Sequence, residues 1–337
     1  MYIDGIFIYG YINTHIIIKK RDIMPINHTP AEQSRKPENK PQKKISFMAS
    51  EPKYSFEDVI LPEDILTEIK NVIALSKYRE LLFDEWGLGS VIKRNQNISI
   101  NLYGDSGTGK TMTAHAIAKS LNKKVLFVKY SEIESKYVGE TSKNLVELFN
   151  SAQEQENVII FDEADALLSK RVTSMNSATD VSVNQTRNVL LKLLDEYSGT
   201  VIFTTNFIQN FDFAFMRRIL CHIKFETPNE AARKQLWSHY LVNKLPLKEE
   251  RELLISDLSK IENLTGADIS IIVLKAALGA VENRQFTIDR ELLREEAAKI
   301  QKAKMARKGD IYTVSSRKVS PEYVTESLNG KRNNEWA

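Results

Sequence analysis

The sequence predicts an α/β fold in which short buried strands alternate with helices, followed by a group of four helices. Short apolar runs bounded by polar residues are typical of buried parallel strands. Such runs cover residues 98–103, 158–162 and 201–205. Apolar residues at helical spacing fill residues 111–121 after the first run. They return near the C-terminal end and predict helices over residues 230–242, 250–259, 268–282 and 289–304.

The length and composition fit a soluble globular protein of about two domains. The chain has 337 residues, of which 42% are hydrophobic and 27% are charged. Residues 1–50 contain eight Lys and Arg against four Asp and Glu, while the remaining residues contain 39 against 40. This nearly neutral body argues against a nucleic-acid partner bound by bulk charge. The single cysteine, Cys221, excludes an internal disulfide and a Cys-rich metal site, and favours a reducing, cytoplasmic location.

Residues 1–53 are expected to form a disordered, basic tail. Apolar patches within residues 1–18 are followed by a basic cluster at 19–21, whereas a secretory signal has its positive charge first. The patches are shorter than the roughly 20 apolar residues of a membrane span, so no membrane partner is expected. A misassigned start, with residues 1–23 untranslated, is one alternative, and a membrane anchor is a less favoured one. Residues 25–45 contain four prolines among polar residues and resemble a linker.

A glycine-rich turn, Gly-Asp-Ser-Gly-Thr-Gly-Lys-Thr, follows the first predicted strand. It satisfies the P-loop pattern, in which backbone N–H groups and a helix N-terminus bind the phosphates of a nucleoside triphosphate. In this pattern Lys110 contacts the β- and γ-phosphates, and the Thr111 hydroxyl coordinates Mg²⁺. The residues expected to bind the nucleotide at this turn are Gly104, Asp105, Ser106, Gly107, Thr108, Gly109, Lys110, Thr111 and Met112.

Two carboxylates end the strand predicted at residues 158–162. Asp162 and Glu163 lie at the carboxyl end of this strand, where ligands bind in open α/β sheets. Asp162 is expected to hold Mg²⁺ through water, together with Thr111, and Glu163 to polarise a water for attack on the γ-phosphate. Because a kinase would not need the second carboxylate, the pair favours hydrolysis.

Three further polar residues complete the predicted catalytic set. Asn206 follows the strand at 201–205 and is expected to orient the attacking water or to contact the γ-phosphate. Arg217 and Arg218 follow eleven residues later and are expected to stabilise charge on the transferring phosphoryl group, in a neighbouring subunit if they lie at a subunit edge. Taken alone, Asn206 would be a turn former and the arginines a solvated helix end. The series of motifs favours the catalytic interpretation.

In this order the motifs resemble the AAA clade of the AAA+ ATPases, which includes katanin, spastin and the FtsH ATPase module. The resemblance covers residues 55–302, and the segment at 212–218, Asp-Phe-Ala-Phe-Met-Arg-Arg, is similar to a katanin-type motif. It implies a doubly wound parallel-sheet P-loop NTPase domain at residues 54–227, a small α-helical lid domain at 228–304, and a C-terminal tail at 305–337 with a short helix. It also implies ATP as the nucleotide and homo-oligomeric rings, usually hexamers.

The resemblance implies roles for two more groups of residues. Lys136, Tyr137 and Val138 resemble a pore loop, whose aromatic residue grips polypeptide in the central channel of the ring. The alternative for Tyr137 is a loop tyrosine that packs against its own domain. Gly266 and Ala267 fall where the family contacts adenine.

Other segments resemble the family less closely. Residues 172–186 fall at the place of a second pore-facing loop, and residues 84–89 resemble a stretch close to adenine. Asp105 and Ser106 replace two prolines that are common in the family's P-loop. The negative charge of Asp105 near the phosphates is expected to lower nucleotide affinity modestly.

The favoured function is a ring-forming ATPase that remodels, unfolds or disassembles protein substrates by pore-loop translocation. Its expected partner is a protein substrate or an adaptor. The alternative is a nucleotide-gated assembly or scaffold ATPase that binds a partner without threading it. A third hypothesis is a P-loop ATPase that acts on DNA or RNA, but the nearly neutral body and the lack of a basic stripe argue against it.

Overall fold

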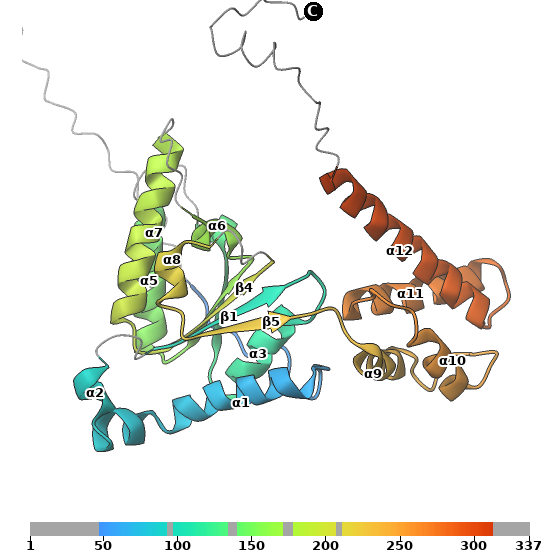
Figure 1. Ribbon diagram of the computed structural model, residues 1–337, viewed down its shortest axis with the longest axis horizontal. Coiled ribbons are helices and arrows are strands. Elements are labelled where there is room, and N and C mark those ends of the chain that lie inside the picture. The colour runs from blue at the N-terminus through green and yellow to red at the C-terminus, as the bar shows by residue number, and fades with distance from the viewer. Residues whose placement is uncertain (1–46, 93–96, 134–139, 171–177, 207–210, 313–337) are drawn as a thin grey trace, which may run out of the picture. The chain divides into compact units, whose positions relative to one another are not determined.

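The computed structural model describes residues 47–92, 97–133, 140–170, 178–206 and 211–312. Strands and helices alternate along the first part of the chain, and a group of helices follows the last strand (Figure 1). This order confirms the predicted fold class. Most of the two predicted tails, at residues 1–53 and 305–337, lies outside the described residues, up to residue 46 and from residue 313 on. Of the remainder, Ser50 forms an antiparallel bridge with Val125, and residues 305–312 belong to the last helix, α12 (Arg290–Tyr312).

Five parallel strands form one sheet in the order β2-β3-β4-β1-β5. The three predicted strands are β1, β3 and β4, which lie side by side in its centre with β4 between the other two. Because the strands are parallel, their carboxyl ends meet at one edge of the sheet. The bounds are β1 (Ile98–Gly104), β2 (Val125–Lys129), β3 (Val158–Asp162), β4 (Thr200–Thr205) and β5 (Cys221–Phe225).

Helices cover both faces of the sheet (Figure 1). On one face, α5 (Glu140–Glu154) and α7 (Ala178–Glu196) pack on the strands, and on the other face α1 (Glu63–Lys77) and α3 (Lys110–Ser120) do so. The two buried clusters arise because successive strand residues point to opposite faces. The shorter elements are a π-helical turn (Leu81–Glu85), α2 (Leu88–Val91), α4 (Tyr130–Ile133), α6 (Asp165–Leu168) and α8 (Phe213–Met216).

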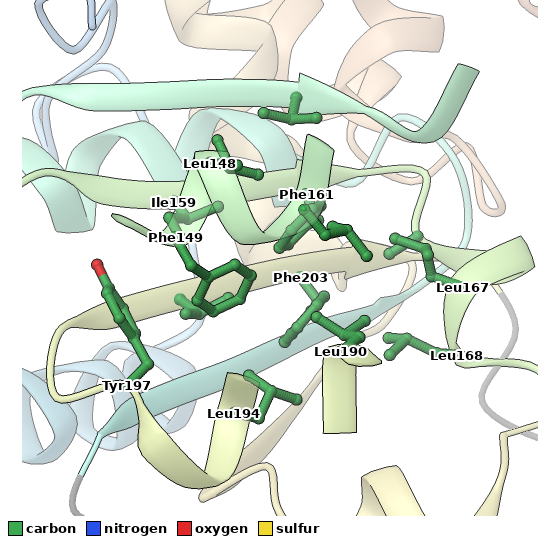
Figure 2. Packing of buried hydrophobic residues seen from close by; sticks show 14 of the residues in the cluster. Leu148, Phe149, Ile159, Phe161, Leu167, Leu168, Leu190, Leu194, Tyr197 and Phe203 are labelled. Carbon is green, nitrogen blue, oxygen red and sulfur yellow. The ribbon is translucent and has the colours of Figure 1, made fainter. Parts of the chain in front are cut away.

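A group of stacked aromatic rings joins the two central strands that end in polar residues. The rings of Phe161 on β3 and Phe203 on β4 are stacked, with centroids 5.3 Å apart, and Phe149 of α5 packs against them (Figure 2). Phe161 and Phe203 directly precede Asp162 and Thr204 in the sequence. The stacked core therefore holds the two polar strand ends at a fixed spacing.

The four predicted C-terminal helices are present and enclose a hydrophobic core of their own. This core surrounds the fully buried Trp237 and includes Leu254, Ile269 and Leu293. A capping box between Thr265 and Asp268 begins the third of these helices. Among the described helices, none has both the length and the apolar character needed to cross a membrane. The bounds are α9 (Glu230–Tyr240), α10 (Arg251–Leu258), α11 (Gly266–Glu282) and α12 (Arg290–Tyr312).

Part of the segment expected to be a second pore-facing loop is helical. Residues 178–186 belong to α7, while 172–177 lie outside the described residues. The apolar residues that anchor α7 on the sheet, including Leu190 and Leu194, lie further along the helix. Once this part is anchored, each added residue gains one backbone hydrogen bond, so the helix extends through its polar N-terminal half.

Candidate nucleotide site

The glycine-rich turn connects β1 to α3 and curls at glycines with positive φ. The φ angles are 140° at Gly104, 81° at Gly107 and 97° at Gly109. A Cβ atom on Gly104 would lie 2.0 Å from the carbonyl oxygen of Phe225, and one on Gly107 would lie 2.8 Å from the Cβ of Ala267. No side chain fits at either position, so only glycine permits this curled loop.

Lys110 is the buried first residue of α3, and its ammonium group is fully engaged. Its Nζ donates hydrogen bonds to the carbonyl oxygens of Gly104 at 2.7 Å and Asp105 at 2.8 Å. A third bond, of 3.0 Å, reaches Oδ1 of Asn206. Burial lowers the pKa of Lys110, while the surrounding carboxylates, Asp105 foremost, raise it. The sequence-predicted Lys110 and Asn206 are therefore brought together.

Asp162 lies beside the first turn of α3 and between two hydroxyl groups. Its Oδ1 accepts hydrogen bonds from the hydroxyl of Thr111 at 2.8 Å and from that of Thr204 at 2.6 Å. Hydroxyl and carboxylate oxygens are ligands that Mg²⁺ prefers, so Thr111 and Asp162 fit this ion. Across the described ranges, no three His, Cys, Asp or Glu side chains gather into a metal site by themselves. A cation here would therefore need phosphate and water oxygens as well.

Glu163 is exposed at the end of β3 and has an unusual backbone conformation. Its φ is 55°, in the left-handed region. Its N–H donates to the hydroxyl of Thr204 at 3.2 Å, and the next N–H, of Ala164, donates to the carbonyl oxygen of Thr204 at 2.9 Å. Thr204 thus contacts both predicted acidic residues. Thr204 was not among the predicted site residues, although it lies near the end of β4, only two residues before the predicted Asn206.

A pocket of about 390 Å³ lies over the glycine-rich turn and between the strand ends and the C-terminal helices. Gly266 and Ala267, at the start of α11, line it, and the N–H of Ala267 donates to the carbonyl oxygen of Gly107 at 3.3 Å. Other predicted residues that line it are Ser106, Gly107, Thr108, Gly109, Lys110, Thr111, Met112, Asp162, Glu163 and Asn206.

The segment 84–89, expected to lie near adenine, is located elsewhere. Asp84, Gly87 and Gly89 border a separate surface hollow beyond the C-terminal end of α1. The wall of the nucleotide pocket is formed instead by the segment 58–60, which precedes α1, and by His239. The sequence pattern did not reveal this because the wall comes from residues far from the glycine-rich turn.

The two predicted arginines differ in their surroundings. Arg218 is half-buried and forms an ion pair with Asp195 on α7, with Nη2 2.9 Å and Nε 3.0 Å from the carboxylate. Arg217 is exposed, and its guanidinium lies 4.8 Å from the ring centroid of Phe213. Neither residue lines the pocket of its own chain. Arg218 is therefore bound within its own domain, whereas Arg217 lies at the surface.

This difference predicts unequal effects of alanine on stability. Arg218→Ala should lower the free energy of unfolding by about 1–2 kcal/mol, since it leaves Asp195 without its cation, although partial exposure of the pair weakens the effect. Arg217→Ala should lower it less, because Arg217 and the ring of Phe213 that it contacts are both exposed. Urea unfolding of both variants measures this, and equal stability losses would contradict the assignment.

His115 of α3 contacts residues 53 and 54, which precede the pocket wall at residues 58–60. It is 3% exposed, and its Nδ1 accepts a hydrogen bond from the backbone N–H of Lys53 at 3.4 Å. Its ring stacks on Phe127 at 5.5 Å and meets the edge of Tyr54 at 5.9 Å. Burial, together with the charge of Lys53, lowers the pKa of His115 below its ordinary value.

The lowered pKa predicts a loss of stability in mild acid. The unfolded chain binds the His115 proton more readily than the folded chain, so stability is full above the unfolded pKa of 6.5. It falls as the pH drops through 6.5 towards the folded pKa. Urea unfolding at pH 7.5 and 5.5 should show a smaller loss for His115→Phe than for the unchanged protein. Because burial also lowers the pKa of His222, some loss should remain in the variant. Equal losses would contradict the prediction.

The chain matches one protein family model and is similar in sequence to proteins of known family. Residues 100–228 match the family model described as "ATPase family associated with various cellular activities (AAA)". The chain is 33% identical over 261 residues to the 26S proteasome regulatory subunit 4 homolog of Schizosaccharomyces pombe, covering 75% of this chain and 56% of that protein. It is 32% identical over 295 residues to the regulatory subunit 8 homolog of the same organism, covering 83% of this chain and 69% of that protein. The chain thus spans little more than half the length of the first of these relatives.

Proposed function

The chain belongs to the AAA family of ATPases and hydrolyses ATP, and from this premise we propose that it forms a ring that remodels, unfolds or disassembles protein substrates. The observation that carries the proposal is the meeting of Lys110, Asp162 and Asn206 beside one pocket, with Glu163 exposed at its edge. Asp162 ends β3, Asn206 follows β4, and Lys110 begins the helix after β1, and these three strands are adjacent in the sheet. They gather around one site the groups that position and stabilise a terminal phosphate.

In the proposed mechanism the N–H groups of the glycine-rich turn and the ammonium of Lys110 bind the phosphates. Thr111 and Asp162 hold the Mg²⁺, which when bound neutralises charge on the phosphate oxygens. The carboxylate of Glu163 takes a proton from the attacking water, and the amide of Asn206 orients that water or contacts the γ-phosphate. Gly266 and Ala267 contact the adenine.

Arg217 is proposed to act on the nucleotide of a neighbouring subunit. It is exposed and lies outside the pocket of its own chain, at a surface that a second copy can approach. Arg218 supports it from within the same domain through Asp195. An active site completed by a neighbour explains why a ring, most simply a homohexamer, would be needed for full activity.

The proposed partner is a protein, either a substrate or an adaptor. The relatives are named as regulatory subunits of the 26S proteasome. Lys136, Tyr137 and Val138 would grip the polypeptide, although they lie outside the described residues. We place the protein in the cytoplasm, with the ATPase domain at residues 54–227 and the lid at 228–304.

The experiment that tests ring formation is the mass in solution of the Glu163→Gln protein, by light scattering after size exclusion. The variant should bind ATP without turnover and assemble into a ring when ATP is added. A protein that binds ATP and stays monomeric would contradict the proposal.

A mixing experiment tests whether each active site is shared between two subunits. Arg217→Ala and Lys110→Ala proteins, each inactive alone, should regain partial ATPase activity when mixed, because a mixed ring contains intact interfaces. If a mixed assembly forms and its ATPase activity does not recover, Arg217 does not act on the nucleotide of a neighbouring subunit.

A further inference from the structure

Asp165 is a half-buried carboxylate at the first position of α6, two residues after Glu163. Its Oδ1 accepts a hydrogen bond from the backbone N–H of Asn206 at 3.1 Å, with Oδ2 at 3.4 Å from the same nitrogen. We infer that Asp165 is a positioning residue of the ATPase site, which fixes the backbone of Asn206 and so holds its amide against Lys110. The inference rests on the role proposed above for Asn206.

The backbone of Asn206 needs this support because it lies beyond the sheet. The pairing of β4 with β3 ends at Phe161 and Phe203, and its pairing with β1 ends at Thr205. Neither ladder reaches Asn206. The backbone N–H of Asn206 therefore bonds to the side-chain carboxylate of Asp165 in place of a strand carbonyl.

A continuous path of contacts leads from Asp165 to the phosphate cradle. Asp165 accepts from the backbone of Asn206, whose Oδ1 accepts from Nζ of Lys110 at 3.0 Å. Lys110 in turn donates to the carbonyl oxygens of Gly104 and Asp105 in the glycine-rich turn. A displacement of the Asn206 backbone would therefore move the amide away from the phosphates.

The same carboxylate helps to hold Glu163 in its strained conformation. A positive φ at a residue other than glycine costs energy and persists only where surrounding contacts enforce it. Three successive residues, 163–165, each bond to the end of β4: two donate to Thr204, and Asp165 accepts from Asn206. Loss of the third bond would loosen the turn that carries the Glu163 carboxylate.

Two substitutions at position 165 separate the hydrogen bond of Asp165 from its charge. An asparagine at position 165 would keep an oxygen acceptor for the N–H of Asn206 and lose the charge. An alanine would lose both.

The test is steady-state ATPase kinetics of the full-length protein, with nucleotide affinity measured separately by titration with a fluorescent ATP analogue. Asp165→Ala should lower kcat on the order of 10- to 100-fold, the cost of misplacing a group near the reacting atoms. Its KM should change by less than about threefold, because the phosphate cradle remains. Asp165→Asn should keep kcat within about threefold of the unchanged protein.

The loss of kcat at nearly constant KM, together with its rescue by asparagine, is a readout that a merely structural role would not give. A general loss of stability would weaken nucleotide binding as well, and asparagine would not restore kcat selectively. Asp289→Asn is the matched control, because Asp289 also accepts a backbone N–H at a helix start, in the lid, and should change neither parameter.

Each outcome decides the inference. Unchanged kcat in Asp165→Ala, or equal losses of kcat in both variants, would overturn it. If Asp165→Ala does not fold, the kcat of Asp165→Asn decides alone, and a loss of more than about threefold would overturn the inference. Asn206→Ala separates the two proposals: if this variant keeps kcat, the role of Asn206 itself fails. If Asn206→Ala loses kcat while Asp165→Ala keeps it, only the inference about Asp165 fails.

Discussion

Replacing Glu163 by glutamine is expected to preserve ATP binding and to lower kcat by at least about 100-fold, the usual contribution of a general base. Glutamine has nearly the same shape but cannot take a proton from the attacking water. The fold should be unaffected, because Glu163 is exposed and its contact with Thr204 is made by the backbone N–H. Release of phosphate and the dissociation constant for ATP, measured on the same sample, check both parts.

Glu156→Gln is the matched control for this substitution. Glu156 is also an exposed glutamate with positive φ, 53° against 55° for Glu163, and it is not among the pocket residues. It should keep full ATPase activity. If Glu163→Gln turned over ATP as fast as this control, the catalytic base would have to be sought elsewhere.

Replacing Lys110 by alanine is expected to weaken ATP binding by at least about 100-fold, equivalent to about 2.7 kcal/mol. The substitution removes the ammonium group and leaves its acceptors in the glycine-rich turn, and that of Asn206, without a donor. It also leaves the negative charges of Asp105 and Asp162 facing the incoming phosphates. Titration with a fluorescent nucleotide measures the effect.

Lys119→Ala controls for a general effect of removing a lysine. Lys119 lies at the other end of α3 and is exposed, so its loss should leave affinity unchanged. Circular dichroism should show that both variants are folded. A dissociation constant for Lys110→Ala within about threefold of the unchanged protein would contradict the phosphate-binding assignment.

The parts of the fold and site that could be predicted from sequence are those set by local patterns. The glycine-rich turn was predictable because its glycines, lysine and threonine lie at fixed spacing within eight successive residues, and the glycines have the positive φ that curls the loop. The strand that ends at Asp162 was predictable because a short apolar run before two carboxylates is a local signal. The four C-terminal helices follow from helical spacing in the same way.

The remaining features depend on contacts between segments distant in sequence. Thr204 acts by reaching Asp162 on the neighbouring strand, and no periodicity encodes which strand lies beside which. Arg217 and Arg218 are adjacent in sequence, but their side chains differ in surroundings: Arg218 forms an ion pair with Asp195 on α7, and Arg217 is exposed beside Phe213. The pocket wall at residues 58–60 depends on how the chain runs before α1. Such pairings are fixed by tertiary packing.

The separate core of the lid has a consequence for how the molecule melts. Its buried residues around Trp237 form a cluster distinct from the two clusters that sandwich the sheet. Two cores with few shared side chains favour two cooperative units, so a calorimetric scan without nucleotide should show two transitions. The pocket proposed to bind ATP is lined by residues of both units, such as Lys110 and Ala267, so ATP should raise and merge the transitions. A single transition with ATP would mean that the bound nucleotide makes the two units unfold together.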